Sequence, residues 1–397
     1  MESKLPQSNA KPLIWQYKNY VIAFIIGVIT KLGLPLSYGL TELGSSIMAL
    51  ILPIIFLWIT ESLGWPSLLV LIGFIVLGYD VGTVTSLSWG NSTVITLLIT
   101  IIFTDSMRKN GVTGAIAAWF YTRKFVKGRP FVFLTMFMLA DFILSLVLSI
   151  ESCIILFSAI ATSFLKDMGY EKKDKFYKCV MLGILWLGAV CDAASPMSHP
   201  IPLVCLGVIE STTGVTISYL EWLKLGLPFG IIMFIIQMLM IRFVVRPDTT
   251  KFMNFDIDKL KDLTPPLDRR GKVTVVIFVM VVLAWLIPDI IRPVLPALSD
   301  FLTQLGAFGP PAIGVCLLCI INFERRPIIE FDKVCADVPW FLIFFFAAIS
   351  LFSGQLSTEE TGISSFFAGV LEPVTEYMSL FVVIVFLCLM TSIITNF

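Results

Sequence analysis

The chain has few charged residues and a single histidine, and both shortages narrow its function. Asp, Glu, Lys and Arg make up only 14% of its 397 residues, and the formal net charge is zero. Without a basic excess the protein lacks the electrostatic footprint of a nucleic-acid binder, so no nucleic-acid partner is predicted. A metal site needs several ligands at matched spacing, whereas His199 stands alone. We therefore expect no metal site and no bound cofactor.

Sequence patterns typical of enzymes are also missing. Cys316 and Cys319 form a C-x-x-C, but it lies in an apolar run and has no partner pair, which is typical of ordinary core cysteines. An intramembrane enzyme that uses His199 with Asp192 is an alternative. No spacing of nucleophile and base supports it, so we expect a protein that is not an enzyme.

Apolar residues, in contrast, are abundant. The chain is 57% hydrophobic with a mean hydropathy of +0.92, which is typical of a polytopic membrane protein. About ten segments reach or approach the roughly 20 apolar residues that one span needs. The segments are 20–36, 45–60, 66–79, 92–106, 131–165, 177–195, 219–246, 273–291, 310–323, 340–354 and 379–397. The sequence predicts an all-α, multi-pass protein of the inner or plasma membrane, surrounded by the lipid bilayer.

The segment 131–165 is the most informative of these. It carries only two charged residues, and it is too long for one span and short for two. Lys and Arg cluster on both flanks, at 123–129 and 166–178, and such residues mark the cytoplasmic side of short loops. We therefore predict a re-entrant hairpin that enters and leaves by one face, with the polar residues 149–152 at its tip.

Basic residues also orient the rest of the chain. They place the N-terminus, 108–129, 166–178 and the polar loop 247–272 on the cytoplasmic side. After Lys333 the chain has no Lys or Arg, and several glutamates follow. The segment 355–378 is therefore predicted to lie outside.

A weak internal repeat adds to this picture. In 89–111 and again in 340–362, a tryptophan opens an apolar run that ends in a polar turn before glycine. One copy ends among basic residues and the other among acidic ones, which is typical of an inverted-topology repeat. At the same offset the tip at 149–151 maps just beyond Phe397. We therefore expect the chain to end inside a second hairpin, either as a fragment or as a product that lacks half of the site.

A second broken segment lies between Cys191 and Pro202. Three prolines in this stretch cannot continue a helix, and it also contains Ser195, Ser198 and His199. Transporters use unwound backbone and hydroxyl groups to bind small cations and carboxylates near the middle of the membrane. We predict a binding site here; the alternative is an ordinary extracellular turn after a span.

Three acidic residues could carry a cation or a proton. A carboxylate deep in the membrane is costly and usually faces a cavity or a partner, which makes Glu151 the first candidate. Asp192 is the second candidate and Asp141 the third. The alternatives are a surface-exposed tip for Glu151 and, for Asp141, a residue on the hairpin flank that pairs with backbone or water.

Several stretches resemble the divalent anion:sodium symporters of the ion transporter superfamily. The run 214–228 is similar to the family's isoleucine–serine–aromatic–leucine stretch before its sixth helix, which ends in glycine–leucine–proline. Ser195-Pro196 resembles the family's threonine–proline segment. The runs 144–149 and 391–397 are similar to the approaches to its two Ser-Asn-Thr hairpin motifs. The resemblance covers about residues 85 to 397 of this chain.

This resemblance implies a homodimer in which a transport domain moves like an elevator against a scaffold. It implies sodium-driven uptake of dicarboxylates, citrate or sulfate. By position, Ser145 and Ser149 would bind sodium, and Ser149 would also contact the substrate. The predicted substrate-binding residues are Ser149, Glu151, Ser152, Ser195, Ser198 and His199. The predicted cation-binding residues are Ser145, Ser149, Glu151 and Asp192.

The chain also departs from the family pattern. Ile150-Glu151 replaces the Asn-Thr of the first hairpin motif, and Asp192 falls where the family has glycine. Two acids thus stand where an anion should bind, and like charges at close range repel strongly at low dielectric. Either a cation or proton neutralises Glu151, or the substrate is not a dianion.

We expect a secondary transporter that carries a small divalent organic anion, or sulfate, with Na⁺ or H⁺ as the coupling ion. Alternatives are a cation/proton antiporter, a carrier of a non-dianionic substrate on the same fold, and a transport-inactive paralogue or fragment.

The sequence also predicts a division of the chain into parts with different roles. It has scaffold spans with an interfacial arm helix at 1–130, a first transport unit at 131–246, a cytoplasmic loop at 247–272, a second scaffold unit at 273–378, and the start of a second hairpin at 379–397. Within the transport unit we expect the hairpin 131–165, a broken helix over 177–208 and a helix over 219–246.

Overall fold

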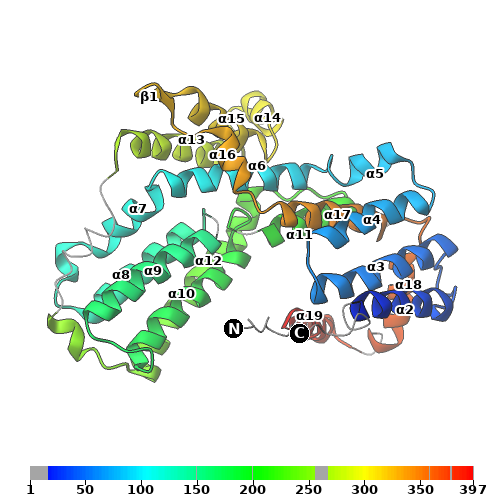
Figure 1. Cartoon of the computed structure of the whole chain (residues 1–397), viewed down its shortest axis with the longest axis horizontal. Coiled ribbons are helices and arrows are strands. Elements are labelled where there is room, and N and C mark those ends of the chain that lie inside the picture. The colour runs from blue at the N-terminus through cyan, green and yellow to red at the C-terminus, as the bar shows by residue number, and fades with distance from the viewer. Residues whose placement is uncertain are drawn as a thin grey trace, which may run out of the picture. The chain divides into compact units, whose positions relative to one another are not determined.

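A computed structural model describes residues 17–148, 150–198, 200–254, 267–356, 358–375 and 378–396 of the chain (Figure 1). Most of these residues are helical, and the described strands are β1 (Asn322–Phe323) and β2 (Arg326–Pro327), which pair antiparallel. Within the described part, four helical stretches are long and apolar enough to cross a membrane. They are Glu42–Thr60, Lys175–Ala194, Tyr219–Val245 and Arg269–Ile291. The predicted all-α polytopic class is confirmed.

The chain divides into two compact units. The first consists of Met1–Asn91 and Trp340–Phe397, and the second of Ser92–Pro339. The predicted division into scaffold and transport parts concerns movement in the membrane and stays a prediction.

The first unit is built from an amino-terminal and a carboxyl-terminal segment of the chain. Its helices are α2 (Lys18–Gly33), α3 (Glu42–Thr60), α4 (Trp65–Val76), α5 (Val81–Leu87), α17 (Trp340–Leu356), α18 (Ile363–Thr375) and α19 (Leu380–Asn396). Thr41 caps α3 by accepting a hydrogen bond from the N–H of Gly44, and its own N–H donates to the carbonyl of Thr361 at 3.2 Å. This bond ties the start of α3 to the turn before α18. Ile47, Phe74 and Leu351 pack in the core between these segments.

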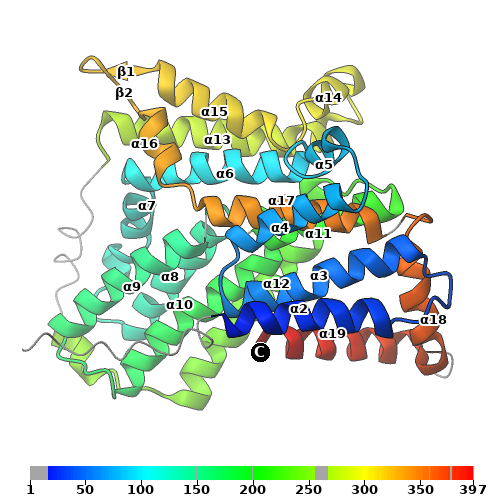
Figure 2. The ribbon, with the colours of Figure 1, turned by 45° about the vertical axis from the view of Figure 1, so that its right-hand side comes forward.

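The second unit carries the remaining helices, which lie in two groups in Figure 2. One group contains α7 (Val112–Tyr121), η1 (Lys124–Val126), α8 (Pro130–Ser145), α9 (Ile150–Asp167), α10 (Lys175–Ala194), α12 (Tyr219–Leu239) with its π-helical end η2 (Met240–Val245), and η3 (Thr250–Asn254). The other contains α6 (Ser92–Lys109), α11 (Pro200–Thr213), α13 (Arg269–Ile291), α14 (Pro296–Thr303), α15 (Gly309–Ile320) and α16 (Phe331–Ala336). Phe103 of α6 stacks on Phe278 of α13, with ring centroids 6.1 Å apart.

The predicted hairpin segment forms two helices that run antiparallel. Phe133 of α8 contacts Phe164 of α9, and Phe137 contacts Phe157, each pair edge to face with ring centroids 5.2 Å apart. Edge-to-face aromatic pairs of this kind add stability beyond the area that they bury. The turn between the helices follows Ser145, so the open end of the hairpin lies at 130 and 167. Its re-entrant course in a bilayer stays a prediction.

Two polar segments meet at this open end, 170–174 and 248–252. The hydroxyl of Tyr170 donates to the carbonyl of Asp248, and the ammonium of Lys251 bonds the Asp174 carboxylate at 3.0 Å. The N–H of Glu171 and the charge of Lys251 hold the pKa of Asp174 below its usual value. Phe252 is buried against Phe133. The basic segments on both flanks of the hairpin thus share one end of the unit, as the predicted orientation requires.

The two copies of the internal repeat have the same local structure. In each, a helix that begins at or just after the tryptophan leads to a glycine in the left-handed conformation, and the next helix starts immediately after it. The glycines are Gly111, with φ +70°, before α7 and Gly362, with φ +62°, before α18. Local geometry therefore agrees with the repeat, whose inverted orientation stays a prediction.

Candidate functional site

Two helix breaks meet inside the second unit. One lies between α8 and α9, and the other between α10 and α11 (Figure 2). The backbone N–H of Ile150, the first residue of α9, donates to the carbonyl of Ser198 at 3.1 Å. A Cβ at Gly188 would lie 3.0 Å from the side chain of Ile150, so a glycine here lets the tip of the hairpin pack closely against α10. The sequence placed both breaks, and the structure brings them into contact.

Four helix ends converge at this contact. The amino ends of α9 and α11 lie beside the carboxyl ends of α8 and α10. An amino end presents unpaired N–H groups and partial positive charge, and a carboxyl end presents carbonyls and partial negative charge. Such a place can hold a carboxylate and a cation next to each other.

Ser198 closes the carboxyl end of α10. It is buried, and its hydroxyl lies 2.7 Å from the carbonyls of both Cys191 and Ser195, to either of which it can donate. These carbonyls already accept the N–H groups of Ser195 and Ser198 respectively, so the hydroxyl adds a second hydrogen bond at the end of the broken helix. The predicted role of Ser198 as a substrate ligand stays a prediction, and the structure adds this capping role.

Ser198→Ala is expected to lower the free energy of unfolding by about 1 kcal/mol, because one buried hydrogen bond from the hydroxyl to a carbonyl is lost. We expect the melting temperature of the detergent-solubilised protein to fall by a few degrees. Ser86→Ala is a suitable control, since the Ser86 hydroxyl bonds the carbonyl of Thr83 on an exposed helix. Equal melting temperatures for Ser198→Ala and the unmodified protein would contradict the capping role.

The start of α12 supports the break from one side. The Tyr219 hydroxyl lies 3.3 Å from the Ser195 hydroxyl, and the Trp222 indole donates to the carbonyl of Ala193 at 3.0 Å. A Cβ at Gly226 would stand 2.2 Å from the Ala194 carbonyl oxygen, so only glycine permits this approach. Sequence reasoning assigned no role to Tyr219 or Trp222. Both residues lie in the family-like motif 214–228, which was the sequence feature that could have identified them.

Asp141 is the most buried acidic group among the described residues near the hairpin tip. Its side chain is fully buried in α8, and its Oδ1 accepts a hydrogen bond from the Ser145 hydroxyl at 3.3 Å. Its Oδ2 has no hydrogen-bond partner among the described residues. At the next residue, the Cys191 thiol lies 3.5 Å from the carbonyl of Phe142, so Asp141 sits close to the end of α10. An ionised carboxylate buried in this way is costly unless a cation or a proton neutralises it.

The other predicted site residues are placed as follows. Ser152 and Asp192 are half-buried, in the first turn of α9 and the last turn of α10 respectively. Ser149, His199 and the side chain of Glu151 lie outside the described part of the chain. Their predicted contacts with substrate and cation therefore stay predictions.

A small cavity of about 80 Å³ adjoins the second break. Pro196 and Met197 form one side, and Thr96 of α6 lies on its lining. The rings of Tyr219 and Trp285 also face it and stack on each other with centroids 5.7 Å apart. The break thus borders space that is lined by both groups of helices in this unit.

Comparison with known proteins places these features in a family. Residues 21–397 match the family model described as citrate transporter. The chain is also 23% identical to the sodium-dependent dicarboxylate transporter SdcS of Staphylococcus saprophyticus, over 96% of this chain and 76% of that protein. The prediction of a transporter rather than an enzyme is confirmed. This multi-pass membrane protein therefore belongs to the citrate transporter family.

Proposed function

We propose that the protein is a secondary active transporter that carries citrate or a dicarboxylate together with a cation. The observation that supports this most directly is the meeting of two helix breaks through the bond between Ile150 and Ser198. The family match and the dicarboxylate transporter relative point to the same class of substrate.

The substrate carboxylate would lie at the amino ends of α9 and α11. The helix dipoles there favour negative charge, and N–H groups of the first turn of α9 after Ile150 are the candidate donors, since Pro200 and Pro202 of α11 have no N–H. Ser149, Ser152, Ser195 and His199 would add hydroxyl and imidazole contacts. In this arrangement the carboxyl ends of α8 and α10 remain for the coupling cation, which would offset the charge of the substrate.

The coupling cation would bind beside Asp141 and Ser145, with Ser149, Glu151 and Asp192 as further candidate ligands. A buried carboxylate whose Oδ2 has no described partner needs a positive charge or a proton. The relative's name specifies sodium for that protein, so Na⁺ is the first choice here. A proton is the second, and the buried state of Asp141 favours it as well.

This transporter would work as a homodimer in the cell membrane with a cytoplasmic N-terminus. The clustering of basic segments at the open end of the hairpin supports that orientation. Sulfate is a less favoured substrate, because neither the family description nor the relative's name includes it.

The test is uptake into proteoliposomes that contain the full chain. Radiolabelled citrate and succinate would be offered with an inward Na⁺ gradient, with an inward H⁺ gradient, and with neither. We expect accumulation of at least one substrate to rise roughly tenfold or more with one of the gradients. Failure of uptake and of counterflow for citrate, succinate and sulfate alike would refute the proposal.

A further inference from the structure

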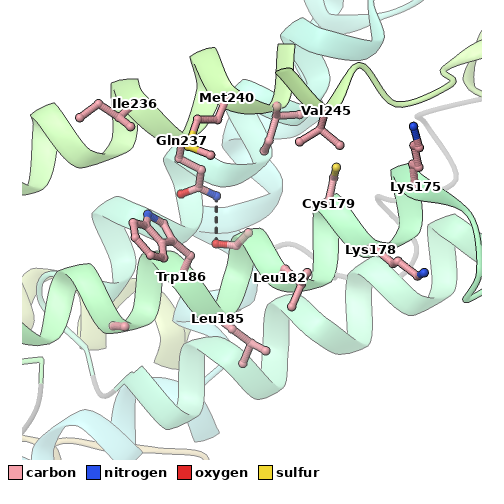
Figure 3. A pocket seen from close by; sticks show the side chains of 13 residues that line it. Lys175, Lys178, Cys179, Leu182, Leu185, Trp186, Ile236, Gln237, Met240 and Val245 are labelled. Carbon is pink, nitrogen blue, oxygen red and sulfur yellow. Dashed lines mark hydrogen bonds between the residues drawn. The ribbon is translucent and has the colours of Figure 1, made fainter. Parts of the chain in front are cut away.

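A long apolar groove runs between α10 and the end of α12, away from the two helix breaks (Figure 3). Its volume is about 710 Å³. Leu182, Leu185 and Trp186 of α10 form one wall, and Ile236 and Met240 belong to the opposite one. All five side chains are exposed, with Leu182 exposed by 63%. No described part of the chain therefore covers the apolar surface of the groove.

Glycine at position 183 keeps the groove deep. The Nε2 of Gln237 donates a hydrogen bond to the carbonyl of Gly183 at 3.1 Å (Figure 3). A Cβ at position 183 would lie only 2.8 Å from this nitrogen, so a larger residue would disturb the contact. This bond holds α12 against α10 at the floor of the groove. The Oε1 of Gln237 has no partner among the described residues, and a bridging water could supply one.

One end of the groove is basic. Lys175 and Lys178 stand there, one turn apart on α10, and none of the described residues that line the groove is acidic (Figure 3). Neither lysine forms an ion pair with a described residue, whereas nearby Lys173 pairs with Glu171 and Lys251 with Asp174. The groove thus joins two uncompensated positive charges to a continuous apolar wall.

We propose that this groove binds an anionic phospholipid, with its phosphate at Lys175 and Lys178 and one acyl chain along α10. Basic pockets between membrane helices on the cytoplasmic side are the sites that take anionic headgroups. From Lys178 to Ala189 the helix rises roughly 16 Å at 1.5 Å per residue. That matches about 15 Å for one leaflet of the hydrocarbon core.

The charge pattern distinguishes a lipid from a protein occupant. A helix from a second copy or from another protein would cover the apolar walls but would need an acidic group at one end. An anionic lipid supplies both parts, because its chain is apolar and its headgroup carries the negative charge. The same end of the unit holds the other basic segments, which the positive-inside rule assigns to the cytoplasmic leaflet.

Trp186 provides a direct probe of the groove. The full chain would be reconstituted in phosphatidylcholine vesicles with increasing fractions of dibrominated phosphatidylglycerol or, in parallel, dibrominated phosphatidylcholine. Bromine quenches nearby tryptophans, and the difference between the unmodified protein and Trp186→Phe isolates this one among the nine. We expect half-maximal quenching of Trp186 at a roughly 25-fold lower fraction of the glycerol lipid, because each of the two lysines contributes about fivefold.

The double variant Lys175→Gln, Lys178→Gln is expected to remove this preference while leaving quenching by phosphatidylcholine unchanged. The matched control is Lys172→Gln, Lys173→Gln, which removes the same charge from the same region outside the groove. Equal quenching by the two lipids in the unmodified protein would show ordinary boundary lipid and overturn the proposal. Quenching of Trp186 by neither lipid would also overturn it, because a protein segment or a second copy would then fill the groove.

Discussion

Asp141→Asn is expected to abolish the stabilisation of the protein by its coupling cation. Asparagine has nearly the same shape, and its Oδ1 can still accept the Ser145 hydrogen bond, but it has no negative charge to balance a cation and no proton to release. An ion present at about 100 times its dissociation constant stabilises the folded state by about 2.7 kcal/mol. Asp141→Asn should lose this ion-dependent stabilisation, and without the ion it should be as stable as the unmodified protein.

The measurement is the melting temperature of the solubilised protein against Na⁺ concentration at fixed pH, and against pH without Na⁺. The unmodified protein should respond to one of the two ions, and Asp141→Asn to neither. Gradient-driven uptake by the variant should fall roughly 100-fold, in proportion to the lost binding energy. Asp167→Asn is the matched control, because Asp167 is exposed at the other end of the hairpin.

An ion response that persists unchanged in Asp141→Asn would place the cation elsewhere. Glu151→Gln and Asp192→Asn would then be the variants to compare, since both acids were predicted from the sequence as cation ligands. A loss of ion response with normal uptake of citrate or succinate would separate the site from the proposed transport cycle.

Gly362→Ala is expected to destabilise the first unit by roughly 3 kcal/mol or more. An alanine Cβ would lie 1.8 Å from the carbonyl oxygen of Gly39 and 2.7 Å from its carbonyl carbon. Both atoms are backbone, so no side chain can move aside. Crowding of this kind typically costs 1–3 kcal/mol, and the left-handed conformation adds about 1–2 kcal/mol for a residue with a Cβ.

The internal repeat supplies a matched control for this variant. Gly111 occupies the same position in the first copy and has nearly the same φ, but nothing lies within 4 Å of a Cβ there. Gly111→Ala should therefore cost only the conformational part, about 1–2 kcal/mol. Melting temperatures of the two variants would be compared in the full chain. Equal shifts would mean that the close approach of Gly39 to Gly362 does not hold the unit together.

The sequence by itself determined the class of protein and the positions of its breaks. Apolar runs of spanning length need no partner to be recognised, because the bilayer stabilises each of them separately. Proline lacks the N–H that a helix interior needs, and Pro196, Pro200 and Pro202 follow Ala194 closely, so the interruption there follows from local chemistry. Single prolines are accommodated inside α3, α12 and α13. The motif 214–228 carried the family resemblance in the same local way.

Only the tertiary structure decided which of these segments meet. The bond from Ile150 to Ser198 joins residues far apart in the chain, and no periodicity encodes such a contact. The burial of Asp141, the support of the break by Tyr219 and Trp222, and the depth of the groove at Gly183 depend on helices packing side by side. Packing is a property of pairs of surfaces, so a single run of residues cannot show it.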